Sequence, residues 1–186
     1  MASHFTDLIQ FWFGERAIIS VNGYMNPVTK TRNGIDGKPK AVTASTICTA
    51  HLVLEDELNV QYSINAGSYV GSRFDISIFG TKGELTFSLQ NKLTLYSREK
   101  TGVKQPVMVE GVFSDEAENK ISIFSGSFRY FAPILAKAIK GNDASLVADA
   151  ATFIDAQYNL KILDAIQKSA NEGAGVSLGD GGNSYV

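Results

Sequence analysis

Apolar and polar residues alternate along much of the chain between residues 45 and 98, which is typical of strands with one buried face. The clearest stretch is 74–89, where every second residue is apolar on both sides of the turn Gly80-Thr-Lys-Gly83. Glycine adopts a positive φ at little cost, so this turn favours a β-hairpin. We expect the neighbouring strands to lie in the same sheet as this hairpin.

The same reasoning predicts further strands at 16–24, 45–55, 58–66, 92–98, 107–112 and, more briefly, 175–178. In the first of them, Ala17, Ile19 and Val21 would stand on one side. Residues 27–43 are polar and rich in turn signals such as Asn33-Gly34, which indicates a long loop.

Three stretches show helical spacing instead. The first opens at Ser3 or His4 and stops at Gly14, and the second runs from Phe124 to Gly141. The third spans 149–172, with Asp149 as the expected N-cap and a buried stripe of Ala151, Ile154, Tyr158, Ile162 and Ile166. The order of elements predicts an α+β fold: a mostly antiparallel open β-sheet with helices packed on one face.

The two faces of the predicted sheet differ in composition. One is apolar, and we expect it to pack on the helices. The other is polar but mostly uncharged: Asn59, Gln61, Ser63, Asn65, Ser77, Thr86, Ser88, Gln90, Thr94 and Tyr96. A scarcity of charged residues together with many hydrogen-bonding groups is typical of a contact surface. We therefore predict that the chain forms a homo-oligomer, a dimer or tetramer, by contacts through this face. The alternative is a solvated Ser/Thr/Asn face.

Composition narrows the class of protein. The chain has 186 residues, 44% of them hydrophobic and 19% charged, with a formal net charge of -2, which suits one globular domain. The sequence has no basic stripe of the kind that would indicate nucleic-acid binding. It also has no apolar run that approaches the roughly 20 residues needed to span a membrane. Cys48 is the only cysteine, which excludes an internal disulfide and argues against a zinc site. With no secretory signal at the start, we expect a cytoplasmic protein.

Candidate chemistry is sparse. His4 lies in the first turn of the first helix with Asp7 three residues on, so the two share a face, and an imidazole there can transfer protons near neutral pH. The alternative is an exposed histidine at a helix start. His51 fits a sheet-face residue better than a metal ligand, and Cys48 fits a buried small hydrophobe. The glycines near residues 173–182 follow a helix and open none, so they do not form a phosphate loop. No metal site and no complete catalytic set is evident from the residues alone.

Several stretches in order resemble the C-terminal domain of the glucose–fructose oxidoreductase / inositol dehydrogenase / MocA family. His4-x-x-Asp7 with Phe11-Trp-Phe-Gly14 resembles that domain's opening helix, and Gly80-Thr-Lys-Gly83 its Gly-Ser-Lys-Gly hairpin. Residues 128–141 resemble its helix ending in Ala-Ile-x-x-Gly, and 162–178 its closing helix and last strand.

The resemblance implies a dihydrodipicolinate-reductase-like C-terminal domain over 1–178, used for substrate binding and oligomerisation, followed by a flexible tail at 179–186. In this family an N-terminal Rossmann domain binds NAD or NADP, and the substrates are mostly sugars and polyols. His4 matches the histidine that moves a proton at the reacting hydroxyl. Asp7 matches the aspartate that supports the substrate site, and Tyr69 matches a substrate contact by position only.

The sequence also departs from the family pattern. It contains neither Gly-x-Gly-x-x-Gly nor the Glu-Lys-Pro that carries the family's catalytic lysine, and both belong to the Rossmann domain. We therefore expect this chain alone to bind no dinucleotide and to have no catalytic activity. Three interpretations remain open: the substrate half of an NAD(P)-dependent oxidoreductase, a non-catalytic relative that senses a sugar or binds a protein, and a domain that only assembles.

Overall fold

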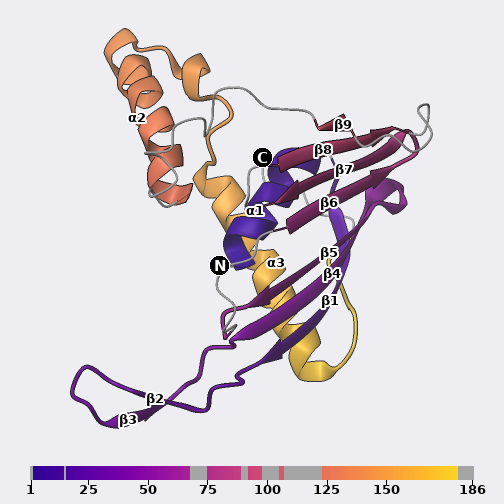
Figure 1. Cartoon of the computed structure of the whole chain (residues 1–186), viewed down its shortest axis with the longest axis vertical. Helices are drawn as coiled ribbons and strands as arrows, with labels where there is room; N and C mark the ends of the chain where they lie inside the picture. Colours follow the sequence, from indigo (N-terminus) through magenta and orange to yellow (C-terminus); the bar gives the residue numbers. More distant parts are fainter. Residues whose placement is uncertain are drawn as a thin grey trace. The chain divides into compact units, whose positions relative to one another are not determined.

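The structure is a computed structural model that describes residues 2–14, 16–67, 75–88, 92–97, 105–106 and 123–179 (Figure 1). Two compact units divide the chain, one made of residues 1–69 and 151–186 and the other of residues 70–150. The described residues contain both antiparallel sheets and α-helices, which confirms the predicted α+β class.

The first unit contains a sheet in the order β10-β1-β4-β5, which we call the first sheet. Its strands are β1 (Ile18–Asn26), β4 (Ile47–Leu54), β5 (Asn59–Asn65) and β10 (Val176–Ser177), and all the described pairings are antiparallel. The short 3-10 turn η1 (Glu55–Glu57) joins β4 to β5.

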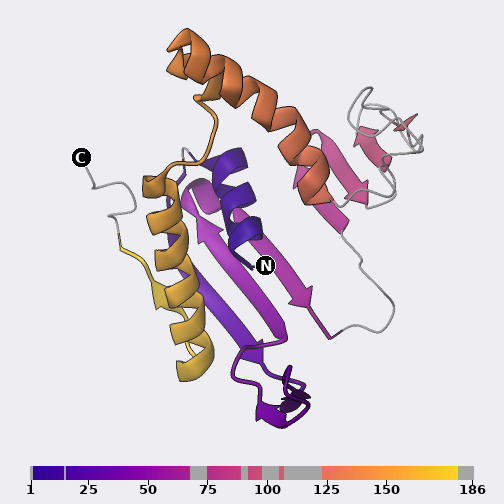
Figure 2. The same cartoon turned by 90° about the vertical axis from the view of Figure 1, so that its left-hand side faces the viewer.

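Helices α1 (Ala2–Phe13) and α3 (Phe153–Glu172) cover one face of the first sheet (Figure 2). The core between them shows the alternation expected from the sequence, because every second residue of β4 is buried. Its members from the sheet and the two helices are Ile9, Ile18, Val21, Cys48, Ala50, Leu52, Leu54, Ile64, Ile162, Ala165 and Ile166.

Strand β1 departs from simple alternation. The pairing of β1 with β4 shifts register between Ile18 and Ser20, as at a β-bulge. Ile18 and Val21 are therefore buried, whereas Ile19 is exposed. The expectation that Ile19 shares the buried side with Val21 is wrong for this reason.

Helix α3 begins later than the sequence suggested. Thr152, and not Asp149, is its N-cap, and Thr152 forms a capping box with Asp155. Residues Ala151 and Ile154 are exposed because they lie before or at the start of the helix. Gly173 ends the helix with a left-handed φ of 66°, as expected of a glycine in that position.

Helix α3 lies close against β1 at Gly23. A Cβ added to this glycine would collide with the backbone carbonyl oxygen of Ile166. The backbone N–H of Gly23 donates to the Ser169 hydroxyl at 2.8 Å, and that hydroxyl donates to the Ala174 carbonyl at 2.7 Å. One buried serine thus ties the end of α3 to the sheet.

Residues 27–43 contain a two-stranded ribbon, so the prediction of a long loop is wrong over 31–33 and 39–41. Strand β2 (Thr31–Asn33) pairs with β3 (Pro39–Ala41), and Gly37 turns the chain with a φ of 71°. The ribbon extends away from the end of the first sheet at which β1 stops and β4 starts (Figure 1).

The second unit contains the hairpin predicted at 74–89. Its strands are β6 (Asp75–Gly80) and β7 (Gly83–Ser88), followed by β8 (Lys92–Ser97) and β9 (Gln105–Pro106) in the order β6-β7-β8-β9. These four strands form one antiparallel sheet within the second unit. The strand predicted at 107–112 lies outside the described residues.

Helix α2 (Ile123–Gly141) and the 3-10 helix η3 (Ala144–Val147) complete the second unit. Pro133 lies inside α2 and does not end it. Ala138 is buried, whereas Phe128 and Ile139 are exposed. No helix in the described part of the chain has the length and apolar character needed to cross a membrane.

Candidate functional site

The first turn of α1 carries the histidine singled out from the sequence. His4 is exposed there, and Asp7 is half-buried one turn further along the same face of the helix. The structure therefore places His4 at the surface, at the start of α1.

Helix α3 fixes the start of α1. The carboxamide nitrogen of Asn159 donates to the backbone carbonyl oxygen of Ser3 at 2.9 Å. Asn159 is buried, and its carboxamide oxygen has no hydrogen-bond partner among the described residues. Its polar group therefore serves the backbone beside His4, and the position of His4 depends on α3.

Strand β5 holds the same turn from the sheet side. Thr6 is fully buried, and its hydroxyl donates to the Ala2 carbonyl at 3.1 Å and lies 3.4 Å from the Tyr62 hydroxyl. The rings of Phe5 and Tyr62 stack with centroids 6.0 Å apart. The first turn of α1 is thus held by a helix on one side and by a strand on the other.

Burial of Tyr62 changes its acidity. Desolvation raises the pKa of Tyr62 to about 12, against the smaller lowering effect of its hydrogen bond with Thr6. The phenol is therefore neutral through the physiological range. Tyr62 supports the helix start as a neutral hydrogen-bonding group and does not act as a base.

The other residues considered from the sequence lie away from this turn. His51 stands on the sheet face opposite the helices, with Nε2 3.1 Å from the Asn59 side-chain oxygen, as expected of a sheet-face residue. Cys48 is buried in the core, and desolvation raises the pKa of its thiol. Tyr69 lies outside the described residues. Within those residues, no three His, Cys, Asp or Glu side chains cluster as a metal site would require.

Sequence reasoning missed the residues that hold the turn, namely Thr6, Tyr62 and Asn159. Asn159 carried a usable signal, because it is a polar residue at helical spacing from the buried Ile162 and Ile166. A polar residue on a buried stripe needs a partner, and that partner is the helix start beside His4.

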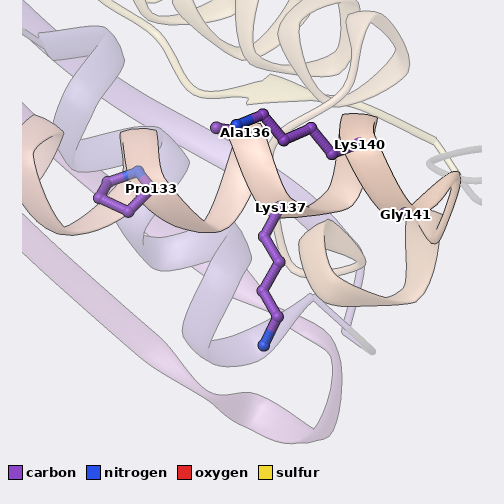
Figure 3. Close-up of a pocket in the computed structure, with 5 residues that line it drawn as sticks. All are labelled: Pro133, Ala136, Lys137, Lys140 and Gly141. Atoms are coloured by element: carbon purple, nitrogen blue, oxygen red, sulfur yellow. The ribbon is translucent and has the colours of Figure 1, made fainter.

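A hollow beside the last turns of α2 is open to solvent. It is lined by Pro133, Ala136, Lys137, Lys140 and Gly141 (Figure 3). The side chains of Lys137 and Lys140 extend in different directions, so their charges do not converge on one ligand. Cations at the end of a helix are accounted for by the helix dipole, so we assign no binding role to this hollow.

Solved structures share this fold over nearly the whole chain. An oxidoreductase domain protein from Kribbella flavida matches with a TM-score of 0.77 at 18% identity, covering 97% of this chain and 49% of that one. Levoglucosan dehydrogenase in complex with NADH and L-sorbose matches with a TM-score of 0.73 at 17% identity, covering 96% and 48%. A super-repressor mutant of Gal80p from Saccharomyces cerevisiae matches with a TM-score of 0.69 at 16% identity, covering 99% and 50%.

These likenesses show the fold, which occurs in an oxidoreductase domain protein, in a dehydrogenase and in Gal80p, described as a transcriptional regulator. The chain spans about half the length of the solved structures that it matches. The model of the oxidoreductase family's C-terminal alpha/beta domain matches residues 1–178, so the chain belongs to the glucose–fructose oxidoreductase / inositol dehydrogenase / MocA family. No curated protein sequence matches it.

Proposed function

We propose that the chain is the substrate-binding and oligomerisation half of an NAD(P)-dependent oxidoreductase that acts on a sugar, a polyol or a related hydroxyl compound. The observation that carries the proposal is the position of His4, which is exposed on a helix start held by Asn159 from α3 and by Thr6 against Tyr62. Membership of an oxidoreductase family supports this reaction class.

In this proposal His4 acts as a general base. When a substrate carbon bearing a hydroxyl is oxidised, its hydroxyl proton passes to the imidazole, and in reduction the imidazolium returns it. Asp7, on the same helix face, contacts the substrate beside His4. Tyr69 is proposed as a further substrate contact by its place in the sequence.

The residues of this chain do not fit a dinucleotide site. The sequence contains no Gly-x-Gly-x-x-Gly, and Gly173 and Gly175 lie between the end of α3 and strand β10. We propose that NAD or NADP is held by a Rossmann domain outside these 186 residues. That domain would also supply the lysine of the family's Glu-Lys-Pro motif, which is absent from this sequence.

We also propose that the outer face of the first sheet meets a second copy of the chain, giving a dimer or tetramer. The register sets Asn22, His51 and Gln61 in one row and Tyr24, Thr49 and Ser63 in the next. The described strands β1, β4, β5 and β10 contain no Lys, Arg, Asp or Glu. An uncharged hydrogen-bonding face avoids repulsion between identical surfaces, which supports self-association.

A non-catalytic role is the second candidate. Gal80p, described as a transcriptional regulator, shares the fold, so the fold alone does not require catalysis. In that case the same helix start would bind a sugar or a protein without proton transfer. A Glu-Lys-Pro sequence in a preceding domain would favour the enzyme, and its absence there would favour the regulator.

The proposal that another domain binds the dinucleotide is tested by titrating the 186-residue chain with NADH and following NADH fluorescence. We expect no saturable binding, because the sequence lacks the glycine-rich motif that holds the pyrophosphate. Micromolar binding by the chain alone would overturn the proposal. A parallel titration with sugars and polyols, followed by the NMR signals of the His4 ring, should show fast, weak binding, and His51 serves as the internal control.

A further inference from the structure

The β2–β3 ribbon carries its positive charge on one face. The register places Arg32 directly opposite Lys40, and Lys30 and Lys38 lie two residues from them on the same face. Four of the chain's 17 basic residues but only one of its 19 acidic residues lie in 30–41. The ribbon is thus strongly basic on a chain whose net charge is -2.

This arrangement is unfavourable within the ribbon itself. Like charges directly opposite each other on an antiparallel pair repel. Asp36 offsets part of the charge, because its carboxylate lies 3.5 Å from the Lys40 ammonium. Lys30, Arg32 and Lys38 form no ion pair with the residues that the structure describes. The ribbon would therefore gain from an acidic surface beyond its own chain segment.

The opposite end of the same strand carries the complementary charge. The turn η1 consists of Glu55, Asp56 and Glu57, all exposed, and it follows β4 directly. Arg16 pairs with Asp56 at 3.2 Å, which leaves the turn net negative. Asp56 and Glu57 have positive φ values of 56° and 60°, so the turn holds two strained residues at the surface.

The ribbon and the acidic turn are too far apart to meet within one chain. Strand β4 has 8 residues between them, a length of about 25 Å at the usual rise per residue. The ribbon also extends away from that strand, on the side opposite to η1 (Figure 1). A second copy whose sheet faces the first with its strands reversed would bring each ribbon to the partner's acidic turn.

We infer that the β2–β3 ribbon docks on the η1 turn of a second copy of this chain. The contact is reciprocal, so two ribbons and two acidic turns pair across one two-fold axis. This contact fixes the relative direction of the strands in the two sheets. The uncharged sheet face alone does not fix that direction. The inference rests on the proposed self-association through the first sheet, and it adds the contact that selects one arrangement.

A nucleic acid is the other anion that a basic ribbon fits. The chain favours the second copy, because the acidic complement is present in its own sequence at the matching end of the sheet. The ribbon also contains no aromatic residue on which a base could stack.

The test exchanges charges between the two elements. The ribbon variant carries Arg32→Glu and Lys38→Glu, and it spares Lys40 because Lys40 already pairs with Asp36. The turn variant carries Asp56→Asn and Glu57→Lys; it spares Glu55, whose carboxylate accepts from the Ala17 N–H at 3.1 Å. Asparagine tolerates the positive φ of residue 56. Lys137→Glu with Lys168→Glu changes net charge as much as the ribbon variant does, at exposed sites elsewhere, and serves as the control.

Self-association is measured by sedimentation velocity, with circular dichroism to confirm that each variant is folded. We expect each variant alone to dimerise at least about tenfold more weakly, and the control to dimerise like the wild type. An equal mixture of the two variants should regain wild-type affinity, because both contacts of the heterodimer are then complementary. Higher salt should weaken the wild-type dimer.

The outcomes separate the two claims. A wild-type dimer that neither variant weakens overturns the ribbon contact and leaves the sheet interface standing. A dimer that the ribbon variants weaken but Gln61→Lys does not would support the ribbon contact and overturn the sheet interface. A wild-type chain that stays monomeric at high concentration overturns both. If labelled duplex DNA binds the wild type but not the ribbon variant, and neither variant alters dimerisation, the ribbon is a nucleic-acid contact and the inference is wrong.

Discussion

The carboxamide of Asn159 donates to the backbone carbonyl of Ser3 at 2.9 Å, across 156 positions of sequence. This one bond joins the middle of α3 to the residue before His4. It makes the candidate site depend on the docking of α3 against α1, two helices from opposite ends of the chain.

Replacing Asn159 by alanine should loosen the start of α1. The Ser3 carbonyl loses its side-chain donor, and a small void replaces the buried carboxamide. We expect the free energy of unfolding to fall by about 1–3 kcal/mol in urea titrations. Gln167→Ala, on an exposed position of the same helix, is the control. Equal stability of the two variants would show that the bond to Ser3 contributes little.

The same variant should also affect the backbone beside His4. Amide hydrogen exchange in the first turns of α1 should quicken in Asn159→Ala more than exchange in β4 does, because the lost bond is local. Uniform quickening through the first unit would instead indicate a general loss of packing.

Tyr62 gives the first unit a sensitivity to alkaline pH. Its pKa is raised from 10.0 to about 12 by burial, so the folded state holds this proton longer than the unfolded state does. The stability that it contributes is complete below pH 10 and is lost as pH rises toward 12. The loss of stability over this range should be smaller in Tyr62→Phe, measured by urea unfolding at several pH values. An identical pH dependence in both proteins would contradict the assignment.

Thr6→Val tests the partner of Tyr62 without changing side-chain volume much. The lost hydroxyl removes the hydrogen bond that lowers the pKa of Tyr62, so that pKa should rise further. Ultraviolet titration of the phenols, taken as the difference from Tyr62→Phe, measures the change. A lower pKa in Thr6→Val would show that the two side chains do not interact as described.

The capping box should make α3 sensitive to acid. Hydrogen bonds from the Thr152 hydroxyl and N–H lower the pKa of Asp155. A carboxyl with a lowered pKa stabilises the folded state above its unfolded pKa, and this contribution is lost as pH falls through the folded value. Thr152→Ala should cost about 1 kcal/mol at neutral pH and less in acid. Asp149→Asn, which removes a carboxyl outside the box, should leave acid unfolding unchanged.

Gly23→Ala should destabilise the packing of α3 on β1. The new Cβ would collide with the Ile166 carbonyl, which is backbone and has little room to move. We expect a loss of about 1–3 kcal/mol in thermal or urea unfolding. Gly37→Ala is a useful comparison, since nothing lies near its Cβ and only the positive φ opposes the change. A Gly23→Ala protein as stable as the wild type would contradict the close approach.

Local patterns in the sequence predicted much of this fold. The hairpin around Gly80 and Gly83, the stop of α3 at Gly173 and the burial of alternate residues in β4 all depend on neighbours within a few positions. Two wrong predictions, the N-cap at Asp149 and the loop at 27–43, concern local structure, whereas the wrong side for Ile19 depended on a distant contact. The bulge at Ile18–Ser20 follows from pairing with β4, which alternation along β1 does not specify.

In the candidate site, too, the residues found from the sequence depend on local spacing, and the residues missed depend on distant contacts. His4 and Asp7 were visible because three-residue spacing on a helix is a local property. Asn159 and Tyr62 were not identified, because their contacts with Ser3 and Thr6 join segments far apart in the chain. A buried asparagine on an apolar stripe indicated that some partner existed, but only the packed helices show which one.

The central claim is that His4 moves the substrate proton, and turnover of His4→Asn tests it most directly. The measurement uses the protein that carries this chain behind a dinucleotide-binding domain, with His51→Asn as the matched control at the chain's other histidine. We predict that kcat falls by about 10²–10⁴-fold in His4→Asn while the Kd for NADH stays within about twofold, and that His51→Asn turns over normally. Unchanged kcat in His4→Asn would contradict the account.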